Sequence, residues 1–412
     1  MSDLSRRGFI GSAALTAGLA GAISGRAEAE PNPSEPDFAF KNNVPDELLS
    51  GDELPTFKFE LEKSRGKVIG GNIGKEATVK QLPISKGIAG VSMTLEPGGI
   101  RELHWHATAA EWAFIIEGRV RTTVIDPQGK QETNDFGPGD VWYFPRGHGH
   151  SLQGMGPGNA HFILIFDNGY FSEFGTFSIT DWLGHTPKAL LAKNLGVPES
   201  ALADIPKGEV YFARGPVPPA EMQPPLFGAL KAPAETHKYE LLKQEPHSIH
   251  NGGREWRLGE DKFPISETVT GVVLDLDPGG LRELHWHPNA DEWQYVISGK
   301  VSVTMFGSHG RYRTETLDKG DVGYIPQGYG HSIENVGAEP ARVLIGFNTG
   351  RYEAIDLSTW LAGNPAYLLS THFGLDRSVV DKLPVGRVFI APKTGATHHL
   401  EGRDDFSPPG DR

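Results

Sequence analysis

The chain contains an internal repeat, and this repeat constrains its fold more than any other feature of the sequence. The segment Pro97–Val120 aligns without gaps on Pro278–Val301, and 15 of the 24 positions are identical. The same offset of 181 residues matches further turns and strands on both sides of this segment. A unit of this length can hold a hydrophobic core of its own, whereas the repeats of a solenoid are much shorter. We therefore expect one domain present in two copies.

Each copy has the pattern of a β protein. Of the 412 residues, 52 are glycine and 31 are proline, a high share that favours short strands and tight turns over long helices. Runs of β-branched and aromatic residues predict strands at Gly90–Leu95, Trp112–Ile116, Arg119–Ile125, Val141–Phe144, His161–Phe166, Thr270–Leu276, Trp293–Ile297, Lys300–Phe306, Val322–Ile325 and Arg342–Phe347. Helices are expected after each set of strands, at Asp181–Leu195, Pro198–Ile205, Leu357–Leu369 and Ser378–Leu383.

The composition excludes several classes of function. The formal net charge is −13 and no basic block occurs, so neither nucleic acid nor a membrane surface is an expected partner. The chain has no cysteine, which excludes disulfides, thiolate nucleophiles and iron–sulfur clusters. Its 16 histidines leave metal sites built from imidazole and carboxylate ligands open.

Residues 1–29 have the pattern of a targeting signal. Adjacent Arg6 and Arg7 precede a short run of small and apolar residues, and Ala27 and Ala29 provide the small side chains of a cleavage site. The paired arginines followed by Phe9 are typical of twin-arginine export, and an ordinary secretory signal is the alternative. We expect a periplasmic or secreted protein. The predicted organisation continues with an N-terminal arm (30–55), a first domain (56–214), a linker (215–235), a second domain (236–395) and a C-terminal tail (396–412).

Four metal-ligand residues recur at matching spacings in the two copies. In the first copy His104 and His106 alternate along one predicted strand, so both imidazoles point to the same face. Glu111 follows five residues later, and His150 lies in a later turn. A chance set of ligand-type residues is seldom repeated, and we therefore predict two metal sites, formed by His104, His106, Glu111 and His150, and by His285, His287, Glu292 and His331.

Three imidazoles and one carboxylate leave two positions of an octahedral site open. This donor set suits Mn(II) or Fe(II), although it does not by itself exclude zinc, nickel or cobalt.

The spacing of these residues resembles the two cupin motifs. Gly99, His104, His106, Glu111 and Gly118 match the first motif, and Gly139-Asp140, Pro145 and His150 match the second. Both copies match, so the chain resembles a bicupin, and its doubled Arg-Glu-Leu-His-Trp-His is similar to that of bacterial and fungal oxalate decarboxylases.

The resemblance implies an all-β fold of two tandem cupin barrels (double-stranded β-helix or jelly roll), each with a short helical extension. It also implies two Mn(II) ions per chain, dioxygen as co-catalyst, oxalate as the small diacid substrate, and a homotrimer or homohexamer.

An arginine precedes the first ligand histidine of each copy by three residues. Simple alternation along a strand would place Arg101 and Arg282 on the face opposite the histidines, unless a bend at the preceding glycines turns them inward. In the family that the chain resembles, the matching arginine contacts the oxalate carboxylate. A guanidinium suits such bidentate binding, and a surface ion pair with the neighbouring glutamate is the alternative.

Oxalate decarboxylation also needs a proton donor. Glu173 matches the lid glutamate of the family, and its neighbour Phe174 stands where the family has a polar residue. In the second copy Ala354 lies opposite Glu173, and Ile345 matches a position that is acidic in many family members. We therefore expect turnover at the first site, and a structural or electron-storing role for the second.

Trp105 and Trp286 match residues through which the family is thought to pass electrons between subunits, and simple packing is the alternative.

The sequence therefore predicts a manganese- and dioxygen-dependent oxalate decarboxylase, a carbon–carbon lyase that produces formate and CO2. Three alternatives remain. An oxalate oxidase would produce CO2 and hydrogen peroxide, another bicupin enzyme would act on a different oxo or hydroxy acid, and a vicilin-like storage or binding protein would have no activity.

Overall fold

The computed structural model describes residues 54–222, 224–225 and 235–394, which all belong to one compact unit over residues 51–412. The expected signal (1–29), most of the arm, much of the linker and the tail lie outside the described residues. Within the described ranges, no helix combines the length and apolar character needed to cross a membrane.

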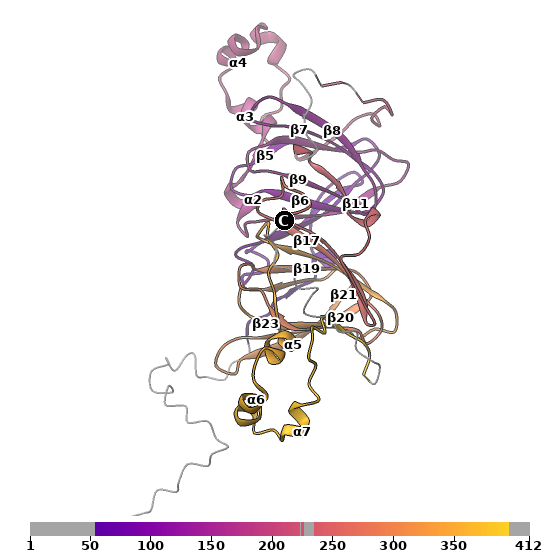
Figure 1. Cartoon of the computed structure of the whole chain (residues 1–412). Coiled ribbons are helices and arrows are strands. Elements are labelled where there is room, and N and C mark those ends of the chain that lie inside the picture. The colour runs from indigo at the N-terminus through magenta and orange to yellow at the C-terminus, as the bar shows by residue number, and fades with distance from the viewer. Residues whose placement is uncertain (1–53, 223, 226–234, 395–412) are drawn as a thin grey trace, which may run out of the picture. The chain divides into compact units, whose positions relative to one another are not determined.

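The first copy folds into two facing antiparallel sheets (Figure 1). The seven-stranded sheet has the order β14 (Lys238–Glu240), β9 (Asp140–Phe144), β6 (Glu111–Glu117), β11 (Ala160–Phe166), β4 (Ala89–Leu95), β3 (Asn72–Ala77) and β2 (Lys67–Ile69). The six-stranded sheet has the order β12 (Thr176–Ser178), β5 (Gly99–His106), β10 (Gly149–Gly154), β7 (Val120–Ile125) and β8 (Gln131–Phe136), with β13 (Phe212–Arg214) also beside β5.

The second copy repeats this arrangement. Its seven-stranded sheet has the order β1 (Lys58–Phe59), β22 (Val322–Ile325), β19 (Glu292–Ser298), β24 (Ala341–Phe347), β17 (Thr270–Leu276), β16 (Gly253–Leu258) and β15 (Ser248–His250). Its six-stranded sheet has the order β21 (Tyr312–Asp318), β20 (Lys300–Phe306), β23 (Gly330–Asn335), β18 (Leu281–Trp286) and β25 (Ile355–Asp356), with β26 (Ile390–Ala391) beside β18. The expected all-β, two-domain jelly-roll architecture is confirmed.

The two copies exchange edge strands and share a hydrophobic core. Strand β1, which precedes the first copy, pairs with β22 of the second, and β14, which precedes the second copy, pairs with β9 of the first. Each copy has its own core cluster, which fills the space between its two sheets. A third cluster draws on both copies and includes Trp112 and Trp293. Each exchanged strand therefore extends one edge of a larger sheet, and the two domains bury apolar surface against each other.

Each of the two longer predicted helices is divided in two by a proline. The first copy has α3 (Ile179–His185) and α4 (Lys188–Leu195), because Thr186 before Pro187 takes an extended conformation. The second copy has α5 (Leu357–Ala362) and α6 (Ala366–Phe373), separated at Gly363-Asn364-Pro365. Of the two shorter predictions, one forms a 3-10 helix at Glu199–Leu202 and the other forms α7 (Arg377–Val380).

Candidate metal centres

A β-bulge places an arginine and the ligand histidines on the same face of strand β5. On the neighbouring strand β10, His150 lies opposite His104, and Leu152 lies opposite Arg101. Three residues of β10 (150–152) thus span four residues of β5 (101–104), and the extra residue reverses the alternation between Arg101 and His104. Arg101 is consequently buried with the ligands, at 3% exposure. The bulge provides the inward turn for which the sequence had suggested a bend at the glycines.

The same bulge occurs in the second copy, where Arg282 lies opposite Ile333 and His285 lies opposite His331. In both copies the residue after the arginine holds the bulge against a distant segment. The Glu102 carboxylate accepts hydrogen bonds from the backbone N–H of Tyr211, at 2.7 Å, and from the hydroxyl of Thr180. The irregular backbone of the bulge is therefore anchored by buried hydrogen bonds.

Strands β5, β6 and β10 bring the four predicted ligands of the first copy together. The donor atoms of His104, His106, Glu111 and His150 lie within 4.8 Å of one another, and all four residues are buried. The Glu111 Oε2 atom lies 3.1 Å from His106 Nε2 and 3.4 Å from His150 Nε2. The other carboxylate oxygen accepts a hydrogen bond of 2.8 Å from the indole N–H of Trp142, which fixes the orientation of Glu111.

Backbone and hydroxyl oxygens orient the three imidazoles. The Nδ1 atom of His104 lies 2.6 Å from the Glu102 carbonyl oxygen, and that of His150 lies 2.9 Å from the His148 carbonyl oxygen. The Nδ1 atom of His106 lies 2.9 Å from the Thr176 hydroxyl. A carbonyl only accepts hydrogen bonds, so Nδ1 of His104 and His150 carries the proton and Nε2 keeps its lone pair. Nitrogen lone pairs therefore converge on one point, as a metal site requires.

Burial and mutual charge set the ionisation of the cluster. Burial lowers the pKa of His106 to about 4 and the pKa of His104 well below its ordinary value. Burial alone would raise the pKa of Glu111, but the adjacent His150 and His106 outweigh it and leave that pKa lowered. Neutral imidazoles and an ionised carboxylate are the forms that bind a metal. The donor set thus fits a divalent cation with oxygen and nitrogen preferences.

The second copy forms an equivalent cluster from His285, His287, Glu292 and His331, which are all buried with donor atoms within 4.8 Å. The Glu292 Oε2 atom lies 2.9 Å from His287 Nε2 and 3.0 Å from His331 Nε2. Nδ1 of each of the three histidines again lies within hydrogen-bond distance of a backbone carbonyl oxygen. Nε2 of His150 and Nε2 of His287 are buried and, although a carboxylate oxygen lies close to each, neither has hydrogen-bond geometry with any described residue, which fits lone pairs reserved for a metal.

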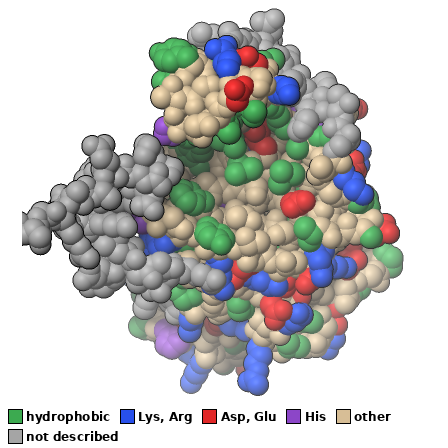
Figure 2. Space-filling model, turned by 90° about the horizontal axis from the view of Figure 1, so that it is seen from below, with side chains coloured by type: hydrophobic (Ala, Val, Ile, Leu, Met, Phe, Trp, Pro, Cys, Tyr) green, Lys and Arg blue, Asp and Glu red, His purple; other side chains and the backbone are tan. Residues whose placement is uncertain are grey.

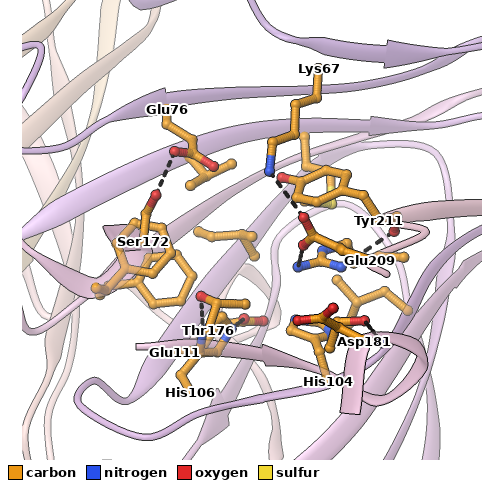
Figure 3. A pocket seen from close by; sticks show the side chains of 18 residues that line it. Lys67, Glu76, His104, His106, Glu111, Ser172, Thr176, Asp181, Glu209 and Tyr211 are labelled. Carbon is orange, nitrogen blue, oxygen red and sulfur yellow. Dashed lines mark hydrogen bonds and ion pairs between the residues drawn. The ribbon is translucent and has the colours of Figure 1, made fainter. Parts of the chain in front are cut away.

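A cavity of about 160 Å³ adjoins the first cluster (Figure 3). Its walls include the ligands His104, His106 and Glu111, the guanidinium-bearing Arg101, and several polar side chains, namely Lys67, Glu76, Ser172, Thr176, Ser178, Asp181, Glu209 and Tyr211. In Figure 3, Ser172 and Glu76 lie on the opposite side from Glu209 and Tyr211. The volume is below that of pockets for drug-sized ligands, and a small polar molecule fits it.

Arg101 is held rigidly at the edge of this cavity. It donates a hydrogen bond of 3.3 Å to the Tyr211 carbonyl, and its guanidinium lies 4.0 Å from the centre of the Tyr211 ring. The nearest carboxylate oxygens, of Glu102 and Glu209, lie 3.7 and 3.8 Å away, beyond hydrogen-bond distance. Arg101 therefore keeps donors for an anionic ligand.

Glu173 lies in the short helix α2 (Phe171–Phe174), which follows β11. The side chains of Glu173 and Phe174 lie outside the described part of the structure. The preceding Ser172 lines the cavity and donates a hydrogen bond of 2.9 Å to Glu76. The chain of α2 therefore passes beside the first cluster.

Two of the remaining predicted residues have surroundings particular to the second copy. Arg282 is buried in an ion pair with Asp356, and Ile345 lies in the hydrophobic core of the second copy. The two tryptophans have similar surroundings, because Trp105 packs edge-on against Trp182 at 5.6 Å and Trp286 packs edge-on against Trp360 at 5.4 Å. Trp105 also stacks on Phe177, with ring centres 5.3 Å apart.

Sequence reasoning missed Tyr211, Glu209 and Asp356. After the barrels the offset between the copies changes from 181 to 178, which aligns Gly208–Ala213 on Gly386–Ala391. A search with this second offset would have found these positions.

The chain matches the Cupin family over residues 60–201 and again over 239–381. It is 41% identical to oxalate decarboxylase OxdC of Bacillus subtilis over 340 residues, which cover 82% of this chain and 87% of that protein. It is 33% identical to a probable oxalate decarboxylase of Arthroderma benhamiae, over 82% of this chain and 83% of the relative.

Solved structures agree with these relatives. The structure of the Bacillus subtilis oxalate decarboxylase at pH 4.6 superposes with a TM-score of 0.78 and 39% identity, covering 83% of this chain and 89% of that one. Another structure of that enzyme, with a TM-score of 0.77, belongs to work on its Mn(II) centres. The doubled cupin domain, the two four-ligand clusters and these similarities show that the chain belongs to the bicupin oxalate decarboxylase family.

Proposed function

We propose that this protein is a manganese-dependent oxalate decarboxylase with turnover at the first metal centre. The reaction converts hydrogen oxalate into formate and CO2, so a carbon–carbon bond breaks and a proton takes the place of the departing CO2. The observation that carries the proposal is the placement of Arg101, a buried cation that lines the same small cavity as the metal donors. A short diacid can meet both the guanidinium and the metal there.

The residues of the first centre have separate roles in this proposal. His104, His106, Glu111 and His150 hold the Mn(II) ion, which together with dioxygen supplies the one-electron chemistry that oxalate needs because it has no electron sink of its own. Arg101 binds and orients one carboxylate. Glu173 supplies the proton to the carbon that loses CO2, as a general acid carried on α2.

The second centre holds its metal with His285, His287, Glu292 and His331 and has a structural or electron-storing role. Its surroundings support this division, because Ile345 is apolar and Arg282 is already paired with an acid.

A product assay tests the proposal. Manganese-loaded protein is mixed with oxalate in air at a mildly acidic pH, and formate and hydrogen peroxide are quantified together. Formate in large excess is the expected result. Peroxide in excess would instead identify an oxalate oxidase, and neither product from metal-replete protein would point to another small oxo or hydroxy acid or to a binding protein.

We also propose that the chain assembles into a homo-oligomer. Hydrophobic side chains are exposed among polar ones on the face seen from below (Figure 2), and exposed aromatic residues on the helical extensions include Trp182, Trp360, Tyr367 and Phe373. An assembly that covers these helices would bring Trp105 and Trp286 of neighbouring subunits closer, as electron transfer between them would require. The mass in solution, measured by light scattering, should be three or six times that of the chain.

Export by a twin-arginine signal is the last part of the proposal, and it rests on residues 1–29. Replacement of Arg6 and Arg7 by lysine should retain the protein in the cytoplasm. Export at the normal level would contradict this route.

A further inference from the structure

The two copies differ in the residue that faces their buried arginine. In the first copy Ser178 of β12 pairs with His104, and in the second copy Asp356 of β25 pairs with His285. Ser178 and Asp356 thus occupy equivalent positions, next to the first ligand histidine and at the start of a helix. One position carries a neutral hydroxyl and the other a carboxyl group.

The side chains at these positions point in different directions. Ser178 caps helix α3, because its hydroxyl accepts a hydrogen bond of 3.2 Å from the backbone N–H of Asp181. Asp356 is the N-cap residue of α5 but makes no capping hydrogen bond. Aspartate is one of the best N-cap residues, so a carboxylate that forgoes the cap has a stronger partner elsewhere.

That partner is a pair of arginines inside the second copy. The Asp356 Oδ1 atom lies 2.6 Å from Arg282 Nη1, and Oδ2 lies 2.5 Å from Arg387 Nε. Asp356 and Arg282 are both buried, at 1% and 2% exposure. Both carboxylate oxygens therefore form close ion pairs with guanidinium groups, and Oδ2 also accepts a hydrogen bond from Arg387.

The first copy has no such pairing among its described residues. Among the described residues, the carboxylate oxygen nearest to Arg101 is that of Glu102, at 3.7 Å, and the residue equivalent to Arg387 is Glu209. Strand pairing supports this equivalence, since Phe212 lies opposite Arg101 and Ile390 lies opposite Arg282. The arginine beside the first metal cluster faces a cavity, whereas the arginine beside the second cluster is paired with a carboxylate of the same chain.

We propose that Asp356 is a built-in carboxylate that occupies the substrate position on Arg282 and closes the second centre to oxalate. This inference rests on the proposed function, because it assigns to Arg101 the binding of an oxalate carboxylate. A carboxylate of the same chain loses no translational entropy when it binds the guanidinium, so it outcompetes a free diacid for that group. The second centre can then bind its metal without binding substrate.

The charges around Asp356 predict what its removal would create. Arg257 also lies in this region, paired at 2.6 Å with Glu255, and its guanidinium lies 3.7 Å from the centre of the Tyr352 ring. Together with Arg282 and Arg387, three guanidinium groups face two carboxylates. Without Asp356 the buried Arg282 would lose the carboxylate that pairs with it, and a dianion of the size of oxalate would be the natural replacement.

Reciprocal substitutions test the inference. Oxalate binding to the manganese-loaded full chain is measured by calorimetry without dioxygen, so that the ligand is not consumed, and manganese content is measured for each variant. We expect one oxalate per chain for the wild type, two for Asp356→Ser and none for Ser178→Asp. The double variant should bind one.

The outcomes separate this inference from the proposed function. A wild type that binds no oxalate would contradict the proposed function itself. Two outcomes would contradict the role of Asp356 and leave the proposed function intact. These are two oxalate molecules bound per chain of wild type, or one bound per chain of an Asp356→Ser variant with full manganese. If Asp356→Ser fails to fold, Ser178→Asp decides, because a folded variant that still binds one oxalate would show that a carboxylate at this position does not close the centre.

Discussion

At the scale of single residues, the two metal clusters depend on the burial of neutral imidazoles around one ionised carboxylate. Burial alone disfavours charge, and Glu111 remains ionised because two histidines lie within 3.4 Å of it. Burial, the neighbouring imidazoles and Arg101 in turn lower the pKa of His104 and the pKa of His106, so these two histidines remain neutral. The cluster is therefore prepared for a metal before the metal binds.

This arrangement predicts how the first centre responds to acid. The pKa of His106 is lowered from 6.5 to about 4, so this imidazole stays neutral as the pH falls through 6.5. A protonated imidazole cannot bind a metal. Manganese should therefore be retained to about pH 5 and lost near or below about pH 4. Metal content after dialysis over a pH series checks this. Half-loss near pH 6.5 would mean that the histidines are not shielded.

Glu173 provides a second prediction at this scale. Replacement of Glu173 by alanine removes the proposed general acid but no metal ligand, so formate production should fall by about 100-fold or more while manganese content stays unchanged. Formate assays and metal analysis measure the two effects. As a matched control, His104→Ala should lower the metal content of the first centre only. Formate production at the wild-type rate in Glu173→Ala would mean that another group donates the proton.

At the scale of elements, the bulge in β5 determines what the first centre can bind. Without the extra residue, Arg101 would point away from the ligand histidines, and the cavity would lose its guanidinium group. The bulge is joined through Glu102 to the segment that carries Tyr211, whose ring and carbonyl oxygen contact Arg101. The segment that carries Tyr211 and leads into β13 thus supports the side chain of Arg101.

Replacement of Glu102 tests this support. Glu102→Ala would leave the buried N–H of Tyr211 without its acceptor and would remove one of the two carboxylates near Arg101, and it should lower the free energy of unfolding by about 2–4 kcal/mol. Glu102→Gln keeps an acceptor oxygen and should cost less. Denaturant unfolding measures both variants. Equal stability of Glu102→Ala and wild type would mean that the bulge needs no anchor.

At the scale of the whole described unit, the two cupin copies are packed against each other through reciprocal contacts. A Cβ atom at Gly90 would lie 2.0 Å from the Trp293 ring, and one at Gly271 would lie 2.1 Å from the Trp112 ring. Each tryptophan therefore packs directly on the backbone of the other copy. The shared core and the exchanged strands β1 and β14 should make the two copies unfold together.

Gly271→Ala should disturb this interface. The added methyl group would displace the ring of Trp112 in a close-packed core, and the expected loss is about 1–3 kcal/mol of unfolding free energy in a single transition. Calorimetry and denaturant unfolding measure it. Gly137→Ala is the control, because no atom lies within 4 Å of the added Cβ and little change is expected. Two separate transitions in either variant would mean that the copies fold independently.

The duplicated domain, the all-β class and the eight predicted metal-ligand residues could be recognised from the sequence alone. These features follow from local spacing, since alternation along a strand places His104 and His106 on one face whatever surrounds them. The breaks at Pro187 and Pro365 also have a local cause, because a proline interrupts a helix. The sequence pattern nevertheless predicted one continuous helix across each of these prolines.

The position of Arg101, the partners of Ser178 and Asp356 and the interface of the two copies are visible only in the folded structure. The position of Arg101 depends on a register shift against β10, and the contrast between Ser178 and Asp356 depends on partners such as Arg282, 74 residues earlier in the chain. The interface of the two copies depends on glycines that lie opposite tryptophans about 200 or 160 residues away. Such pairings are set by packing between distant strands, which no local pattern records.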